Sequence, residues 1–234
     1  MEMHVHAEGQ LSCIEDGALR LQTKDGRWVV PKGRIIWIPA RVRHAFAVVG
    51  ESASWQLLLS RSMARLLPKE VCVLSVSPLL LASLEELILE QQRERSQKRI
   101  RALMAMIRCD LERAKPHPLG LQIPKDAVLR KATDSLLLAP ADERGIDGWA
   151  KELGMSRRSF TRRFSEETGT SFAKWHRTLK LQRALESLAA GNSVSDVALE
   201  LNYESVSAFV AAFKRHYGSP PAQYVTSDHS AAGA

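Results

Sequence analysis

Cysteine is scarce in this sequence, with three residues among 234. Cys13, Cys72 and Cys109 form an odd, scattered set that has neither the close spacing of a zinc site nor the density of a disulfide framework. We therefore expect reduced thiols in the core or at the surface, without a role in metal binding.

A membrane-spanning segment and a signal peptide are also missing from the pattern. The longest apolar run, 71–84, is interrupted by serine and proline and is too short to cross a bilayer. The N-terminus carries Glu2, His4, His6 and Glu8 instead of a basic region followed by an apolar stretch. These absences predict a soluble, cytoplasmic protein without a membrane partner.

Acidic residues are outnumbered by basic ones, 26 to 33, which leaves a formal net charge of +7. An excess of this size suits an anionic partner such as nucleic acid, although a surface can be basic for other reasons. The length and the 45% hydrophobic content are sufficient for two domains, each with its own core.

The most informative feature that is present is an internal repeat, in which residues 150–169 recur at 198–218. Small, apolar and turn positions stay in register across the two copies, and the second copy contains one extra residue. This conservation of pattern within one chain indicates two copies of one supersecondary unit. The matching pairs are Ala150/Ala198, Glu152/Glu200, Leu153/Leu201, Ser156/Ser205, Phe160/Phe209, Phe164/Phe213 and Gly169/Gly218.

Each copy has the pattern of a helix-turn-helix. Gly154 can adopt the left-handed conformation of the turn, and Asn202, the other residue type that tolerates it, holds the same place in the second copy. Ser156 is a suitable N-cap for the second helix of the first copy. We therefore predict helix-turn-helix units at 146–166 and 194–217, an arrangement typical of a DNA reader.

The second helix of the first unit separates apolar from basic side chains. At about 100° per residue, Phe160 and Phe164 lie on one side, and Arg158 and Arg162 lie on the other with Thr161. A helix in the major groove would direct these arginines to base edges, and its flanking Arg157 and Arg163 to phosphates. The alternative is a solvated basic face without function; the turn before the helix and the second copy favour DNA binding.

The second helix of the second unit is chemically different. With Phe209 and Phe213 inward, its outward residues are Ser207, Val210, Ala211 and Lys214. Two of these can only make apolar contacts, such as those with thymine methyl groups, while Lys214 and Arg215 could hold the DNA backbone. We expect this unit to add affinity more than discrimination.

The double unit, the helix between its copies and the closing Gly-Ser-Pro-Pro-Ala-Gln-Tyr at 218–224 resemble the AraC/XylS transcription regulators. The resemblance covers about the last hundred residues and implies two units that enter successive major grooves on one face of DNA. It implies base-facing roles for Arg158, Thr161 and Arg162, and for Val206, Ser207, Val210 and Ala211. The second helix is more apolar than in many members of the family. The complete expected DNA-binding set is Ser156, Arg157, Arg158, Thr161, Arg162, Arg163, Ser205, Val206, Ser207, Val210, Ala211, Lys214 and Arg215.

The first seventy residues have a different pattern, with short β-branched or aromatic segments separated by glycine and proline. Such spacing predicts a small antiparallel barrel or sandwich. His4, His6, Gln10 and Gly17, followed by Gly33, Pro39 and His44, resemble the two cupin motifs. Because the chain starts close to the first motif, it leaves little room for the strands that often precede it. The expected strands are 18–23, 27–30, 34–38, 44–49 and 54–59.

Side-chain alternation along a strand would place His4 and His6 on one face, where Gln10 and His44 could join them. The three imidazoles could bind a divalent metal. Against this, Gln10 stands where metal-binding cupins usually supply a glutamate, and Arg41 replaces the usual glycine. We therefore expect no resident cofactor. The favoured interpretation is that His4, His6, Gln10, Trp37 and His44 line an effector pocket or satisfy one another by hydrogen bonds.

Residues 83–115 have a helical pattern with two apolar stripes. These stripes cover the barrel or pack against a second subunit, and homodimerisation through them is favoured, partly by analogy with the family. The predicted organisation is a cupin-like sensor barrel at 1–76, a helical dimerisation segment at 77–115, a linker at 116–123, a DNA-binding domain at 124–227 and a disordered tail at 228–234.

The sequence therefore predicts a multi-domain α and β protein: a cupin-like β-barrel followed by helices, then an all-α double helix-turn-helix domain. Its expected function is transcription regulation through double-stranded DNA, controlled by a small-molecule effector, with RNA polymerase as a partner if it activates. No catalytic residue is assigned. Two alternatives stay open: a metal-dependent cupin enzyme with accessory basic helices, and a DNA-binding adaptor that senses nothing.

Overall fold

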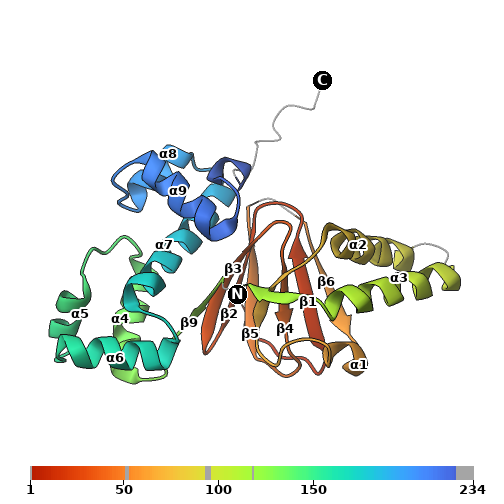
Figure 1. Ribbon diagram of the computed structural model, residues 1–234, viewed down its shortest axis with the longest axis horizontal. Coiled ribbons are helices and arrows are strands. Elements are labelled where there is room, and N and C mark those ends of the chain that lie inside the picture. Colours follow the sequence, from red (N-terminus) through yellow and green to blue (C-terminus); the bar gives the residue numbers. More distant parts are fainter. Residues whose placement is uncertain (1, 51–52, 93–95, 118, 225–234) are drawn as a thin grey trace.

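The N-terminal half of the computed structural model is a pair of antiparallel sheets that face each other (Figure 1). The structure describes residues 2–50, 53–92, 96–117 and 119–224, so the predicted tail at 228–234 lies outside the described residues. One sheet has the order β6-β1-β4-β7-β8 and the other β5-β2-β3-β9. The strands are β1 (Gly9–Ile14), β2 (Ala18–Thr23), β3 (Gly26–Pro31), β4 (Ile35–Ile38), β5 (His44–Val49), β6 (Ser54–Leu59), β7 (Cys72–Ser75), β8 (Lys115–His117) and β9 (Gly120–Gln122).

Apolar residues on the facing sides of the two sheets form the core between them. Leu19 and Leu21 on β2 and Ile36 and Ile38 on β4 are fully buried and belong to one cluster. The alternate positions on β2 are more open, and Arg20 faces outward. The fold class predicted from the sequence is therefore confirmed for the N-terminal half, although the two sheets do not close into one continuous barrel.

Helices α2 (Pro78–Gln92) and α3 (Gln97–Leu111) pack against the outer face of the five-stranded sheet, and a short helix α1 (Arg61–Ala64) follows β6 (Figure 1). Leu84, Leu87, Ile107 and Leu111, from the two predicted apolar stripes, are buried in the cluster that includes Trp37. These stripe positions cover the sheet of their own chain. Neither these helices nor any other helix among the described residues is long and apolar enough to cross a membrane.

Residues 116–123, predicted as a linker, instead belong mainly to the sheets. β8 pairs with β7 and β9 pairs with β3, so the chain crosses from one sheet to the other in this short segment. Ile123 N donates to Asp25 O at 2.9 Å and continues the pairing. Proline in this segment suggested a loop, but proline is compatible with an edge strand, and β8 is the edge of its sheet.

The C-terminal half is all helical, as predicted. Its elements are α4 (Ala127–Leu138), α5 (Ile146–Glu152), α6 (Arg157–Thr168), α7 (Phe172–Ala189), α8 (Val194–Glu200), α9 (Val206–Tyr217) and a short 3-10 helix η1 (Pro221–Tyr224). The long helix α7 joins the two helix-turn-helix units and also lies against the four-stranded sheet (Figure 1). Leu181, Leu185 and Ala189 on α7 share one buried cluster with Val29 and Val30 on β3. A continuous apolar core therefore joins the two halves.

Candidate nucleic-acid interface and effector cavity

Local signals in the sequence fix the turn of each helix-turn-helix unit. Gly154 has φ of +65° and Asn202 has φ of +52°, so both turns use the left-handed conformation. Ser156 Oγ accepts from Ser159 N at 3.1 Å, and Ser205 Oγ accepts from Ala208 N at 3.1 Å. These bonds satisfy backbone donors at the first turns of α6 and α9 and define where the helices begin.

Aromatic side chains anchor α6 and α9 on their inner faces. Phe160 and Phe164 are 0% exposed, and Phe164 lies with its ring centroid 5.8 Å from that of Trp175 on α7. In the second unit, Phe213 is 0% exposed and its ring centroid lies 5.5 Å from that of Tyr224 on η1. Each helix is held by a large apolar contact, which leaves its opposite face free for another molecule.

The outer face of α6 carries the predicted arginines. Arg157, Arg158 and Arg162 are exposed, and Arg162 pairs with Glu166 one turn later at 3.0 Å. Arg157 pairs with Asp147 on α5, whereas no ion pair within the described residues involves Arg158. Exposed pairs of this kind contribute little stability, so Arg157 and Arg162 can exchange their carboxylates for a ligand at low cost.

Arg163 differs from the other arginines because it is half-buried and joins α6 to the start of α4. Its guanidinium bonds the carboxylate of Asp126, and Asp126 accepts from Val128 N at 2.9 Å at the start of α4. The backbone bonds at α4 and the Arg163 guanidinium together keep the pKa of Asp126 below its usual value. Arg163, predicted to contact phosphates, therefore fixes α6 against α4 in this structure.

The outer face of α9 is less basic, as the sequence predicts. Val206 is 42% exposed, and Ser207, Ala211, Lys214 and Arg215 are also exposed. Thr161 on α6 and Val210 on α9 occupy corresponding positions of the repeat, and both are half-buried. The two recognition helices are therefore exposed to the same degree at this position, although their side chains differ in chemistry.

The structure brings His4, His6, Gln10 and His44 together at one end of the sheets. His4 and His44 face each other in an antiparallel bridge, and their ring centroids are 4.4 Å apart. His6 Nε2 lies 2.7 Å from Gln10 Oε1, and Gln10 Nε2 donates to Ser12 Oγ at 2.8 Å. Alternation along the strand, as predicted, puts these groups within reach of one another.

Trp37, the fifth residue of the predicted pocket, does not join this group. In the pairing of β1 with β4, Trp37 lies opposite Leu11 whereas Gln10 lies opposite Ile38, so Trp37 and Gln10 occupy opposite faces of the sheet. Trp37 is 1% exposed, packs with α2 and α3, and donates from Nε1 to Pro68 O at 2.7 Å. All four residues of β4 are buried, so alternation alone could not show which face the tryptophan takes.

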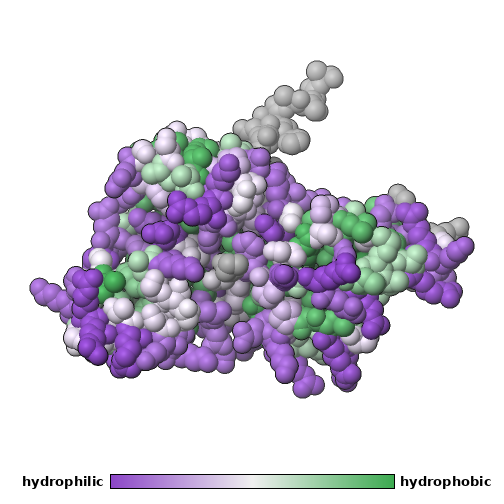
Figure 2. Space-filling view, viewed as in Figure 1, coloured by the Kyte–Doolittle hydropathy of each residue, from purple (hydrophilic) through white to green (hydrophobic). Residues whose placement is uncertain are grey.

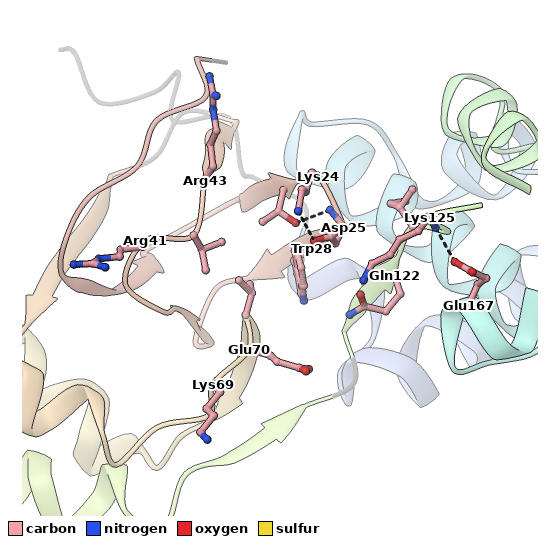
Figure 3. A pocket seen from close by; sticks show the side chains of 14 residues that line it. Lys24, Asp25, Trp28, Arg41, Arg43, Lys69, Glu70, Gln122, Lys125 and Glu167 are labelled. Atoms are coloured by element: carbon pink, nitrogen blue, oxygen red, sulfur yellow. Dashed lines mark hydrogen bonds and ion pairs between the residues drawn. The ribbon is translucent and has the colours of Figure 1, made fainter. Parts of the chain in front are cut away.

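A cavity of about 610 Å³ lies between one end of the sheets and the start of the helical domain (Figure 3). Trp28, Val42, Val71 and Ile123 supply its apolar surface. Five cations and three carboxylates also line it, which gives a lining charge of +2; the charged residues are Lys24, Arg41, Arg43, Lys69, Lys125, Asp25, Glu70 and Glu167.

One wall of this cavity belongs to the first recognition helix. Glu167 on α6 accepts from the backbone N of Lys125 at 2.8 Å and of Asp126 at 3.4 Å, so it holds the start of α4 (Figure 3). The cavity therefore touches the sensor sheet, the segment that leads to α4, and α6. No local sequence pattern marks this cavity, because its residues come from five separate places in the chain.

A buried ion-pair cluster fastens α7 to the sheet. Glu186 on α7 is 3% exposed. Both of its carboxylate oxygens accept from Arg27 Nη2 at 2.7 Å, and one also accepts from Arg20 Nη1 at 3.4 Å. Nearby, Gln182 Nε2 donates to Leu119 O at 2.9 Å. The sequence offered one signal for this contact: α7 carries apolar residues on more than one side, which is typical of a helix with two buried surfaces.

The fold and the two recognition helices define a DNA-binding transcription regulator with an N-terminal ligand-binding domain. Residues 149–227 match the model of a helix-turn-helix domain, and residues 1–131 match the model of the AraC-like ligand binding domain. The chain therefore belongs to the AraC family of transcription regulators.

Several curated proteins and solved structures are similar to this chain. The HTH-type transcriptional regulator NimR of Escherichia coli (strain K12) is 29% identical over 223 residues, which cover 95% of this chain and 81% of NimR. The regulator RipA of Corynebacterium diphtheriae is 28% identical over 115 residues, which cover 49% of this chain and 33% of RipA. ToxT from Vibrio cholerae aligns in structure over 94% of this chain and 90% of its own, with 14% identity and a TM-score of 0.43.

Proposed function

We propose that α6 reads bases through Arg158 and Arg162, and that α9 contributes mainly apolar and backbone contacts. The observation that carries this assignment is the pair of exposed arginines on a helix anchored by buried Phe160 and Phe164. Arginine bonds guanine through two hydrogen bonds, which discriminate between bases. Lys214 and Arg215 would hold phosphates beside the second site.

The experiment is a selection of bound sequences from random DNA at near-physiological salt with the full-length protein. We expect an asymmetric motif in two parts about one helical turn apart. Arg162→Ala should relax the preference at one base position, whereas Lys214→Ala should weaken all sequences equally. Identical preferences for Arg162→Ala and the wild type would contradict the assignment of Arg162.

We further propose that the 610 Å³ cavity is the effector site. Its lining charge of +2 favours a ligand with a negative group, and its apolar surface favours a small organic body. A ligand there would contact the wall formed by Glu167 and would change the position of α6 relative to α4. A thermal-shift comparison of organic carboxylates with their neutral amides, on wild type and Lys125→Ala, tests this site; equal shifts for acid and amide would contradict the expected charge.

Homodimerisation through α2 and α3 is a further part of the proposal. Leu79 and Leu89 on α2 and Met104 and Met106 on α3 are 36–54% exposed, and Figure 2 shows hydrophobic side chains gathered over these helices. Light scattering should give a dimer for the wild type and a monomer for Leu79→Glu with Met104→Glu. Two dimers would assign self-association to a different surface, and two monomers would contradict homodimerisation. RNA polymerase enters as a partner only if the promoter position makes the protein an activator.

A second candidate role, binding of a divalent metal by the three histidines, is supported by how their rings are oriented. Nδ1 of His4, His6 and His44 lies 3.4, 2.6 and 2.8 Å from the backbone carbonyls of Glu2, Glu8 and Val42. An Nδ1–H that donates to a carbonyl leaves Nε2 as the ligand atom, the usual arrangement in metal sites. For His6 a bound ion would replace the present contact of Nε2 with Gln10 Oε1 at 2.7 Å. Nε2 of His44 is buried without a partner, and burial lowers the pKa of His44, which favours the neutral form.

One ring nitrogen from each histidine lies within 4.8 Å of the others. Ligand nitrogens about 2.1 Å from one zinc ion are roughly 3.4 Å apart, so the exposed His4 would have to move closer. A bound ion would join residues 4–6 to β5. Isothermal titration with zinc should show one site that His4→Ala with His6→Ala removes and that His229→Ala retains. The metal-dependent enzyme alternative needs, in addition, turnover that disappears with the same double variant.

A further inference from the structure

A second cavity, of about 460 Å³, lies within the helical domain between α7 and α9. Leu181 and Ala212 supply its apolar surface, and three of its five polar side chains are permanent cations. Among the residues that line it there is no carboxylate; the full lining is Lys174, Arg177, Thr178, Leu181, Ala212, Arg215 and His216.

The three permanent cations of this cavity have no internal counter-charge. Within the described part of the chain, no ion pair involves Lys174, Arg177 or Arg215. His216 adds a half-buried imidazole whose Nε2 has no hydrogen-bond partner among the described residues. A cluster of like charges beside an unsatisfied ring nitrogen is stabilised when an anion enters it.

The internal repeat shows which side chains the first unit has at the positions that line this cavity in the second unit. The pairs Phe160/Phe209, Phe164/Phe213 and Gly169/Gly218 all differ by 49 positions. At the same offset, Arg215 corresponds to Glu166, and His216 corresponds to Glu167.

In the first unit, carboxylates of the protein itself accept the hydrogen bonds on this flank of α6. Glu167 accepts from Lys125 N at 2.8 Å, and Asp126 accepts from Arg163. In the second unit, α7 takes the place that α4 has in the first, but it presents Lys174 and Arg177 to α9. Both sides of the second flank are therefore basic, and a carboxylate or phosphate acceptor for these exposed cations would have to come from another molecule.

We propose that the cavity between α7 and α9 binds a phosphate group. Arginine and lysine supply charge-assisted donors for phosphate oxygens, and the Thr178 hydroxyl can complete the set. The backbone of bound DNA is the favoured source, because α7 joins two units that enter successive grooves and therefore faces the phosphates between them. This source depends on the DNA-binding role proposed above; a free phosphorylated molecule would use the same donors.

The DNA source is tested by titrating the selected DNA site at several salt concentrations with the full-length protein. Lys174→Ala with Arg177→Ala should bind about tenfold more weakly and lower the slope of log affinity against log salt by about one unit. The matched control is Arg101→Ala with Lys131→Ala, which removes the same residue types from exposed positions outside the cavity and should leave the slope unchanged. A purely structural role for Lys174 and Arg177 would alter affinity without a change in slope.

A free phosphorylated molecule, as the alternative to DNA, is tested by measuring the unfolding temperature. Inorganic phosphate is compared with chloride at equal ionic strength. Saturable stabilisation that is lost in Lys174→Ala with Arg177→Ala, with an unchanged DNA slope, would assign the site to a free phosphorylated ligand. His216→Glu restores the carboxylate of the first unit and should abolish both effects in a folded protein. The proposal is overturned if neither the salt slope nor phosphate stabilisation depends on these residues. Wild-type protein that binds no DNA would contradict the DNA-reading proposal and leave the phosphate measurement decisive here.

Discussion

The contact between α7 and the sheet leads to a quantitative prediction for Glu186→Gln. Glutamine keeps the shape of the side chain but removes the charge that Arg27 and Arg20 share. The side chains of Glu186 and Arg27 are 4% and 14% exposed, so Arg27 would be left buried and unpaired; Arg20, at 35%, can reach water. Breaking a buried pair by removing one partner costs roughly 3–5 kcal/mol, and the exposure of Arg20 places this case near the lower end, at about 3 kcal/mol.

The assay is urea and thermal unfolding of the full-length protein. For a chain of this length, a loss of about 3 kcal/mol corresponds to a fall in Tm of roughly 6–12 °C. Glu200→Gln is the matched control: its partner Arg183 also lies on α7, but the two side chains are 46% and 45% exposed, so the cost should stay below about 1 kcal/mol. Equal losses for the two variants would refute the reasoning, because they would mean that the Glu186 carboxylate is not desolvated.

Three further predictions concern other sites. Arg158→Ala should cost roughly 1–3 kcal/mol of DNA-binding free energy and relax preference at one base position, measured by competition between site variants. Burial, with His117 and Lys174 nearby, lowers the pKa of His216 to about 4. The stability that goes with the neutral ring is therefore fully present above about pH 6.5 and is lost as the pH falls toward about 4. At about pH 5 the loss in the free energy of unfolding is about 2 kcal/mol. His216→Asn should flatten that part of the pH profile of urea unfolding. Gly9→Ala should lower the Tm by several degrees, because a Cβ there would lie 2.1 Å from the ring of Trp37.

The helical half was predictable from sequence because its signals are local and occur twice. A left-handed turn residue, a serine N-cap and two phenylalanines one turn apart each constrain a few neighbouring residues. At Gly154 and Asn202 the structure has the positive φ that the repeat suggested. Exposure of Arg158 and Arg162 follows from the same geometry, whereas the engagement of Arg163 by Asp126 requires α4, a helix more than 30 residues away in the sequence.

The parts that sequence could not predict depend on contacts between distant segments. β4 is buried on both faces, so its pattern does not show that Trp37 turns away from the histidines. β8 and β9 are three residues each and find partners only because β7 and β3 offer free edges. The 610 Å³ cavity and the Glu186 cluster likewise form only when the helical domain packs against the sheet.

The position of Glu186 sets a requirement for how an effector could control DNA binding. A ligand shifts an equilibrium only by its difference in affinity for the two states. The 610 Å³ cavity includes residues of the sheet and of α6, so ligand affinity depends on whether the domains are packed together. If separation of α7 from the sheet breaks a contact that contributes about 3 kcal/mol, this contact alone favours the packed state on the order of 10²-fold before any ligand binds. Weakening Glu186 should therefore leave more of the unliganded protein with α7 separated from the sheet, so that a ligand bound in the cavity shifts a larger share of it to the packed state. The stability of this contact would then set the sensitivity of the regulator.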